Sequence, residues 1–289
     1  MTWQLSMGFF FICSVINVLW QRTYAQKSKL SGKVPPALQY AFGLIPFALI
    51  YALFSGNIHI TWSTSTIIYL VLEGLFIGLF NWLAFLAYKK TNVAQFETIF
   101  QSYALTAALL GWILLHESLT GMQLIGSALL IGGALIAANA SQEKKKQSMT
   151  SGAVLTFMAA TALGIGLVAE KAAIGRMTLS AYFIFGYGTQ VIASLAIGAR
   201  ELTQTKKELF TRHELLSCLG IGLLSALGGF FYIYALSKTS NVGLTTIIST
   251  FQLPLVVIGG YFILKEKDNV ARMALASVVA FAGLLLCSL

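Results

Sequence analysis

Ten long apolar stretches constrain the fold of this 289-residue chain more than any other feature of its sequence. A helix that crosses the hydrocarbon core of a bilayer, which is about 30 Å thick, needs roughly 20 apolar residues. The stretches cover residues 3–24, 35–54, 66–89, 92–115, 121–139, 150–171, 178–199, 214–236, 241–264 and 269–288. They are continuous and lack the alternation of barrel strands. We therefore expect an all-α polytopic membrane protein with ten transmembrane helices.

The composition agrees with a membrane protein and argues against a catalyst. Apolar residues make up 57% of the chain and charged residues only 10%, too few to cover a soluble domain of this size. Cys13, Cys218 and Cys287 each lie alone inside an apolar stretch, which predicts buried thiols and no disulfide framework or metal site. The chain has no HExxH, GxSxG or Walker A motif. We expect no enzymatic activity and no cofactor.

The basic residues are divided unequally between the connections. Sixteen of the 19 Lys and Arg residues lie at the junctions after odd-numbered stretches: Arg22, Lys27, Lys29, Lys33, Lys89, Lys90, Lys144, Lys145, Lys146, Arg200, Lys206, Lys207, Arg212, Lys265, Lys267 and Arg272. The positive-inside rule places these junctions in the cytoplasm and both termini outside, in a cytoplasmic (plasma) membrane. The first stretch is long enough to be a retained signal anchor. This distribution indicates a lipid bilayer as partner and no nucleic acid.

The sequence repeats itself at an offset of 149 residues. Residues 86–117 align without a gap with residues 235–266, and the same offset pairs Gln21-Arg22 with Glu170-Lys171. Residues 140–149 form a basic linker, which separates a first five-helix repeat (1–139) from a second one (150–289). Because each half has an odd number of spans, the second must enter the membrane with opposite polarity. We therefore expect two inverted repeats, with a binding site between them near the midplane.

Several motifs carry a family resemblance. The fourth span of each half ends in Glu (LLHES and LKEKD), FQLPL lies midway along the ninth span, and GSALLIGGALIAA and ASVVAFAGLLL form two spans rich in small residues. Together with the two five-span halves, these motifs resemble the EamA-like members of the drug/metabolite transporter superfamily. The resemblance covers essentially the whole chain. It implies a metabolite exporter and a cavity bounded by spans 1, 3, 4, 6, 8 and 9. Gln39-Tyr40 stands where many relatives carry Arg, which argues against an anionic substrate.

The repeated segments also supply candidate binding residues. Glu97 and Gln101 lie one helical turn apart, and the matching positions in the second half are Thr246 and Thr250. The first span carries a stripe of polar residues along one helical face, and the family resemblance places this face at the cavity. Polar or aromatic residues of other spans are further candidates. We expect the substrate to contact Asn17, Trp20, Gln21, Asn81, Gln101, Tyr232, Thr246 and Thr250.

Glu97 and Glu73 are the candidate proton-coupling residues. A carboxyl group inside an apolar span is costly unless it faces a cavity or a partner, and such a group can exchange a proton near neutral pH. Two alternatives stay open for these residues: Glu97 reaches Lys89 or Lys90 at the membrane surface, or Glu73 pairs with groups of a neighbouring helix. We expect Glu170, beside Lys171, to form an interfacial salt bridge.

The function expected from these observations is secondary transport. The chain would export a small organic metabolite, such as an amino acid, by proton-coupled alternating access. A monomer suffices because both halves lie in one chain, although a dimer is compatible with the sequence. The alternatives are a flippase for a lipid-linked intermediate and a non-transporting membrane sensor or assembly partner.

Overall fold

The chain folds into a bundle of helices. The structure, a computed structural model, describes residues 2–55, 57–115, 120–139, 146–238, 252–266 and 270–287. Its elements are α1 (Trp3–Lys27), α2 (Val34–Ser55), α3 (Thr64–Tyr88), α4 (Val93–Phe100), α5 (Tyr103–Leu115), α6 (Gly121–Ala138), α7 (Lys146–Ile174), α8 (Leu179–Gln204), the short 3-10 helix η2 (Lys207–Leu209), α9 (Arg212–Lys238), α11 (Gln252–Phe262) and α12 (Val270–Cys287). Seven of these, α1, α2, α3, α6, α7, α8 and α9, are long and apolar enough to cross a membrane, and α11 and α12 are shorter apolar helices.

Local sequence signals account for many helix starts. Thr2, Ser63, Asn92, Thr120 and Thr178 occupy N-cap positions, and the side chain of each accepts a hydrogen bond from a backbone N–H of the first turn. These bonds satisfy donors that have no partner within the helix. At α6 the side chain of Gln123 completes a reciprocal capping box with Thr120. Short polar residues therefore set the ends of helices whose interiors are apolar.

The single helix expected over residues 92–115 is divided. The α-helix stops at Phe100 and resumes at Tyr103. Between them the backbone tightens, since Ser102 N donates to Ile99 O at 3.1 Å and Ala104 N donates to Gln101 O at 3.1 Å. Each of these bonds joins residues three positions apart, which is the pattern of a 3-10 turn. The turn lies at Gln101 and Ser102, two buried polar residues beside the candidate site.

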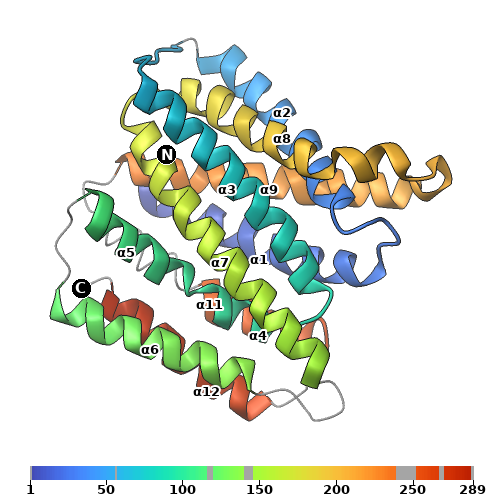
Figure 1. Ribbon diagram of the computed structural model, residues 1–289, viewed down its shortest axis with the longest axis vertical. Helices are drawn as coiled ribbons and strands as arrows, with labels where there is room; N and C mark the ends of the chain where they lie inside the picture. Colours follow the sequence, from blue (N-terminus) through green and yellow to red (C-terminus); the bar gives the residue numbers. More distant parts are fainter. Residues whose placement is uncertain are drawn as a thin grey trace.

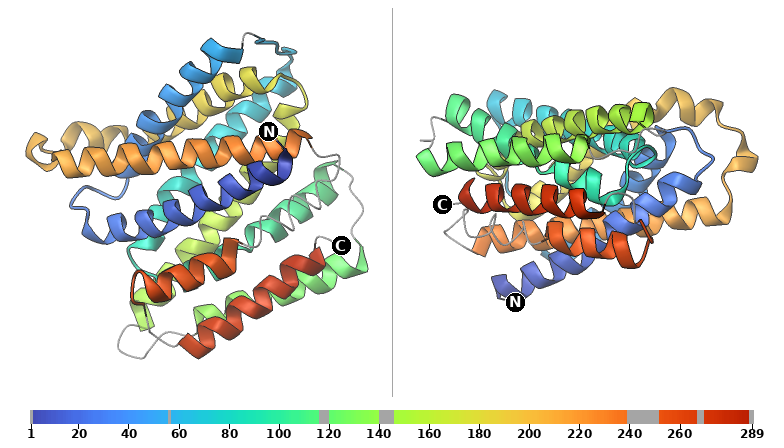
Figure 2. Two further views of the ribbon diagram at one scale, coloured as in Figure 1. Left: turned by 180° about the vertical axis from the view of Figure 1, so that it is seen from behind. Right: turned by 90° about the horizontal axis from the view of Figure 1, so that it is seen from below.

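The helices form two layers, as the end-on view of Figure 2 shows. In Figure 1, α3 and α7 cross the front of the molecule and α1 and α9 lie behind them. α3 contacts α7, α1 contacts α9, α2 contacts α8, and α6 contacts α12. Helices from residues 1–139 thus pack mainly against helices from residues 146–287.

Small residues allow the close approach of α6 and α12. A Cβ atom on Gly133 would lie 2.9 Å from the backbone oxygen of Ala276 and from the Cβ of Ala280. One on Gly283 would lie 2.6 Å from the backbone oxygen of Gly126. Larger side chains at these positions would separate the two helices.

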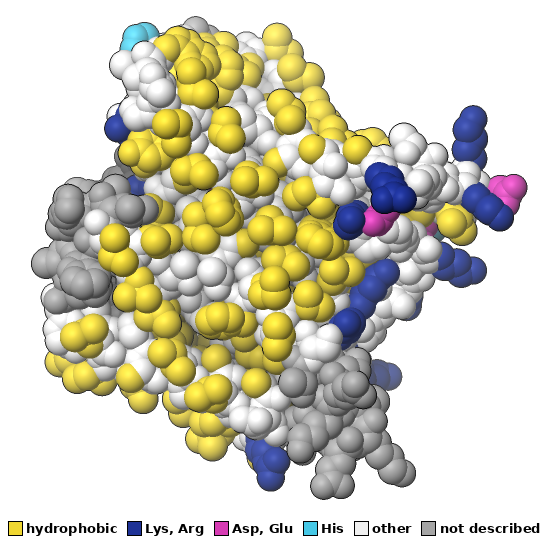
Figure 3. All heavy atoms as spheres, viewed as in Figure 1, with side chains coloured by type: hydrophobic (Ala, Val, Ile, Leu, Met, Phe, Trp, Pro, Cys, Tyr) yellow, Lys and Arg dark blue, Asp and Glu magenta, His cyan; other side chains and the backbone are white. Residues whose placement is uncertain are grey.

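Apolar side chains cover the broad face of the molecule, and Lys and Arg gather along one edge (Figure 3). Contacts confirm that the α1–α2 and α8–α9 connections lie together. Glu214 accepts hydrogen bonds from Ser28 Oγ at 3.0 Å and from Lys29 N at 3.3 Å, and Lys33 pairs with Glu201 at 3.1 Å. The α2–α3 and α7–α8 connections meet elsewhere, where Thr61 N donates to Arg176 O at 2.9 Å. The basic residues of the α1–α2 and α8–α9 connections therefore lie in one part of the molecule.

Candidate functional site

A cavity of about 320 Å³ lies inside the bundle. α1, α2, α3, α4, α7 and α9 line it, together with Tyr103 of α5 and Gln252 of α11. Its walls combine aromatic side chains with amides and hydroxyls, and they include the carboxyl groups of Glu97 and Glu170. None of the described residues that line the cavity is Lys, Arg or His. A mostly apolar pocket with a few convergent polar groups is typical of a small-molecule site.

The structure brings six of the expected site residues to this cavity. They are Asn17, Gln21, Asn81, Glu97, Gln101 and Tyr232. They come from four helices and the α4–α5 turn, so their proximity depends on the whole bundle. Within it, the Tyr232 ring centroid lies 5.5 Å from that of Phe10, and Asn81 Nδ2 donates to Pro36 O at 3.2 Å.

The other expected residues lie elsewhere. Trp20 is 38% exposed and its indole contacts Gly220 of α9, so it is not among the residues that line the cavity. Glu73 is fully buried between α3 and α8 and does not line the cavity either. Thr246 and Thr250 lie outside the described residues.

Glu97 faces the cavity from α4. Its side chain is 1% exposed, and its Oε1 accepts a hydrogen bond from Tyr88 Oη at 3.4 Å. Gln252 of α11 interacts with the same carboxyl group, and Ser14 Oγ donates to Gln252 Oε1 at 2.6 Å. The alternative in which Glu97 reaches a surface lysine is wrong. Lys89 Nζ donates to Leu30 O and Lys90 Nζ donates to Ser151 Oγ.

Amide side chains hold the cavity walls together. Gln21 and Gln39 form a reciprocal pair, with Nε2-to-Oε1 distances of 3.1 Å and 2.9 Å. Asn17 Nδ2 donates to Ile221 O at 2.9 Å and to Ser225 Oγ at 2.8 Å, which joins α1 to α9. These polar groups are therefore satisfied by neighbouring helices, and the same residues remain part of the cavity lining.

Glu170 and Gln39 also line the cavity, although their sequence pattern did not indicate it. Glu170 is 9% exposed and lines the cavity, so its expected place at the membrane surface is wrong. The reason is that α7 continues to Ile174, about one turn beyond the expected end of this span. Gln39 stands out in an apolar stretch, and its buried partner Gln21 explains its presence.

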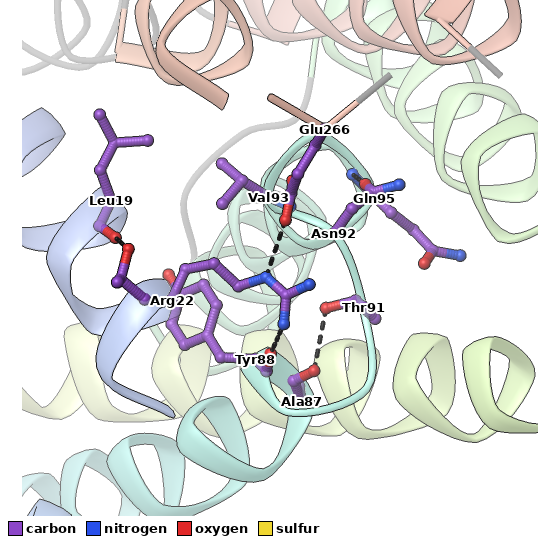
Figure 4. A network of polar contacts seen from close by, with 10 residues as sticks. Leu19, Arg22, Ala87, Tyr88, Thr91, Asn92, Val93, Gln95 and Glu266 are labelled. Atoms are coloured by element: carbon purple, nitrogen blue, oxygen red, sulfur yellow. Dashed lines mark hydrogen bonds and ion pairs between the residues drawn. The ribbon is translucent and has the colours of Figure 1, made fainter. Parts of the chain in front are cut away.

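A buried ion pair ties four helices together beside the cavity (Figure 4). Arg22 Nε, on α1, lies 2.9 Å from Glu266 Oε1, just after α11, and Arg22 Nη1 donates to the backbone oxygen of Tyr88 at the end of α3. Glu266 Oε2 accepts a hydrogen bond from Val93 N at the start of α4, at 2.7 Å. Both charged groups are thus paired and hydrogen-bonded, as a buried ion pair requires.

Comparisons with known proteins agree with this architecture. A solved crystal structure superposes with a TM-score of 0.64 over 96% of this chain and 97% of its own length, at 13% sequence identity, which supports the fold alone. No curated protein matches the sequence. Residues 6–139 match the model of the EamA-like transporter family. This part of the chain is therefore similar to members of the EamA-like transporter family.

Proposed function

We propose that the protein is a secondary transporter that exports a small organic metabolite across the cytoplasmic membrane by proton-coupled alternating access. The observation that carries the proposal is the cavity of about 320 Å³, which polar residues from both halves of the chain line together. A volume of this size accommodates a small metabolite. Helices of both halves form its walls, so a relative movement of the halves would change the access to it.

The helix contacts support an arrangement of ten spans in two inverted repeats. α1 contacts α9, and α7, which would occupy the place of α1 in the second half, contacts α3, the counterpart of α9. α2 contacts its counterpart α8, and α6 contacts its counterpart α12. A pseudo-two-fold axis between the halves would produce these reciprocal contacts. In this arrangement α4 and α5 together form the fourth span.

The charge of the lining favours a neutral or positively charged substrate. Glu97 and Glu170 line the cavity, and the described lining residues include no basic side chain. An anion would therefore meet no opposite charge in a site of low dielectric constant. An amine or another cationic group fits the two carboxyl groups, with amides such as Gln101 and Asn81 to bind polar substituents.

A stability screen of the purified protein in detergent tests this proposal. The panel contains amines, amino acids, nucleosides, sugars, organic acids and lipid precursors. A ligand at about 100 times its dissociation constant stabilises the native state by roughly 2.7 kcal/mol. The screen includes Gln101→Ala and the matched control Gln4→Ala, on the exposed start of α1.

We expect amines to raise the melting temperature of the wild type and of Gln4→Ala, and to have a smaller effect on Gln101→Ala. Uptake of the identified amine into proteoliposomes then tests transport. Stabilisation by lipid precursors alone would favour a flippase, and stabilisation by organic acids would contradict the charge argument. A ligand that binds and is never transported would favour a sensor.

A further inference from the structure

A second carboxyl group lies behind the cavity wall. Glu170 of α7 lines the cavity, whereas Glu73 of α3 is completely buried outside it. The hydroxyl of Tyr182, on α8, donates to Glu73 Oε1 at 2.8 Å and also interacts with the Glu170 carboxyl group. One phenol therefore connects a carboxyl group at the cavity with one that the cavity does not reach.

The contacts of Glu73 are incomplete. Its Oε1 accepts hydrogen bonds from Tyr182 Oη and from Gln190 Nε2, each at 2.8 Å. Its Oε2 is buried and has no hydrogen-bond partner among the described residues. A carboxylate oxygen without a donor is costly in such a place, whereas a protonated oxygen carries no charge. The unpartnered oxygen therefore favours the neutral, protonated form of the Glu73 carboxyl group.

The described groups that act on these two carboxyl groups include no Lys, Arg or His. The groups that act on the two carboxyl groups are Tyr40 from α2, Tyr182, Tyr187 and Gln190 from α8, and the carboxyl groups themselves. Both salt bridges found among the described residues lie elsewhere, at Arg22–Glu266 and Lys33–Glu201. Two neighbouring buried carboxyl groups that lack a cation cannot both ionise without a large penalty, so the pair retains a proton.

The packing of α3 and α8 supports this close arrangement. A Cβ atom on Gly186 would lie 2.6 Å from a ring carbon of Tyr182 and 3.1 Å from Glu73 Oε1. A Cβ atom on Gly74 would lie 2.7 Å from the backbone of Thr189. The two glycines let the helices approach until the Tyr182 hydroxyl reaches Glu73.

We propose that Glu170 and Glu73 share one exchangeable proton through Tyr182 and that this pair is the proton-coupling site of the transporter. The proton enters from the cavity onto Glu170. Glu170 then gives its proton to the Tyr182 oxygen while Tyr182 gives its own hydrogen to Glu73 Oε1. The tyrosine is unchanged after the step, Glu170 is ionised and Glu73 is neutral. An ionised Glu170 attracts an amine in the cavity, and the reverse transfer releases the amine.

The coupling role rests on the proposed transport function, but the proton site can be tested without a substrate. Infrared spectroscopy of the purified protein detects the carbonyl band of a neutral carboxylic acid. The measurement compares the wild type, the double variant Glu73→Gln/Glu170→Gln, and the matched control Glu208→Gln, at an exposed glutamate of η2. We expect a carbonyl band near neutral pH that the double variant loses and the control retains.

Transfer through the tyrosine is tested with Tyr182→Phe, which removes the hydroxyl and keeps the ring. After a switch from H2O to D2O, the carbonyl band shifts as the carboxyl groups exchange. We expect the exchange rate of the Glu73 carboxyl group to fall at least about tenfold in this variant. Removal of a group that transfers a proton typically lowers a rate by more than that. An unchanged rate would reject the role of Tyr182. A double variant with the complete wild-type band would reject the shared proton.

These outcomes are independent of the transport assay. If the double variant loses the carbonyl band but the wild type transports no amine, the proton site is supported and the proposed transport function is rejected. If amine uptake by the double variant still depends on a proton gradient, the transport function is supported and this coupling site is rejected.

Discussion

Two acidic sites in this protein differ in whether a cation lies beside the carboxyl group. Glu266 lies 2.9 Å from Arg22 and also accepts a hydrogen bond from Val93 N. Glu73 is more deeply buried, at 0% exposed against 17% for the Glu266 side chain, but its described partners are neutral, and one of its oxygens has no described partner. The first carboxyl group therefore has a positively charged partner, whereas the second has none among the described residues.

Burial alone therefore does not assign a role to an acidic residue in a membrane span. An ion pair such as Arg22–Glu266 fixes the charge and joins α1 to the end of α11, which suits a structural contact. A carboxyl group without a cation is suited to bind and release a proton or a substrate amine.

Glu266→Leu is expected to have the largest effect on stability. It leaves the Arg22 guanidinium buried without a counter-charge and removes the acceptor of Val93 N. Breaking one side of a buried ion pair typically costs about 3–5 kcal/mol. Chemical denaturation in detergent should show a loss of this size in the free energy of unfolding.

The double variant Arg22→Met/Glu266→Leu provides the control for that experiment. It removes both charges, so we expect it to recover most of the lost stability. If the single variant costs less than about 1 kcal/mol, the pair acts like a surface salt bridge and the comparison with Glu73 fails.

Glu97→Gln is expected to reduce transport and to leave stability almost unchanged. Glutamine keeps the shape and hydrogen-bonding capacity of a neutral carboxyl group, and Glu97 forms no ion pair among the described residues. Loss of the charge should lower amine uptake into proteoliposomes by about tenfold or more, the effect of losing roughly 1.4 kcal/mol of binding. Wild-type uptake with an unchanged pH dependence would remove Glu97 from the site.

The sequence predicted the apolar helices and part of the site because both depend on regular spacing. Apolar runs identify spans whatever their neighbours are, and Asn17 and Gln21 could be recognised as one face of a single helix. The i, i+4 spacing of Glu97 and Gln101 likewise indicated that the two side chains lie on one side of a helix. The 3-10 turn after Phe100 left no such signal, since no Pro or Gly marks it.

Contacts between helices could not be predicted in this way. Tyr182, Gly186 and Gln190 lie at four-residue spacing, which suggests one polar face of α8, but nothing in the spacing indicates that Glu73 lies opposite. The expected surface position of Glu170 was wrong because a span boundary was set too early, and the last turn of α7 decides whether that residue faces lipid or cavity.

Gly186→Ala tests the close packing at the neutral site. The added Cβ would crowd the Tyr182 ring and Glu73 Oε1, and overpacking of this kind typically costs about 1–3 kcal/mol. We expect a lower melting temperature and a shifted carbonyl band in the infrared spectrum. Gly188→Ala is the control, because a Cβ there has no neighbouring atom within 4 Å. Equal behaviour of the two variants would show that Tyr182 and Glu73 do not need this contact.

The smallest effect is expected at Glu201, whose ion pair with Lys33 is partly exposed. The side chains are 27% and 34% exposed, and the Nζ–Oε1 distance is 3.1 Å. Solvent-exposed pairs contribute about 0–1 kcal/mol because water and salt screen them. Glu201→Gln should therefore change the free energy of unfolding by less than about 1 kcal/mol, and less in high salt. Lys33 keeps its position over the Trp82 ring in this variant, so packing there is preserved. A loss as large as that of Glu266→Leu would mean that the presence of a cation, and not burial, determines the energy of both pairs.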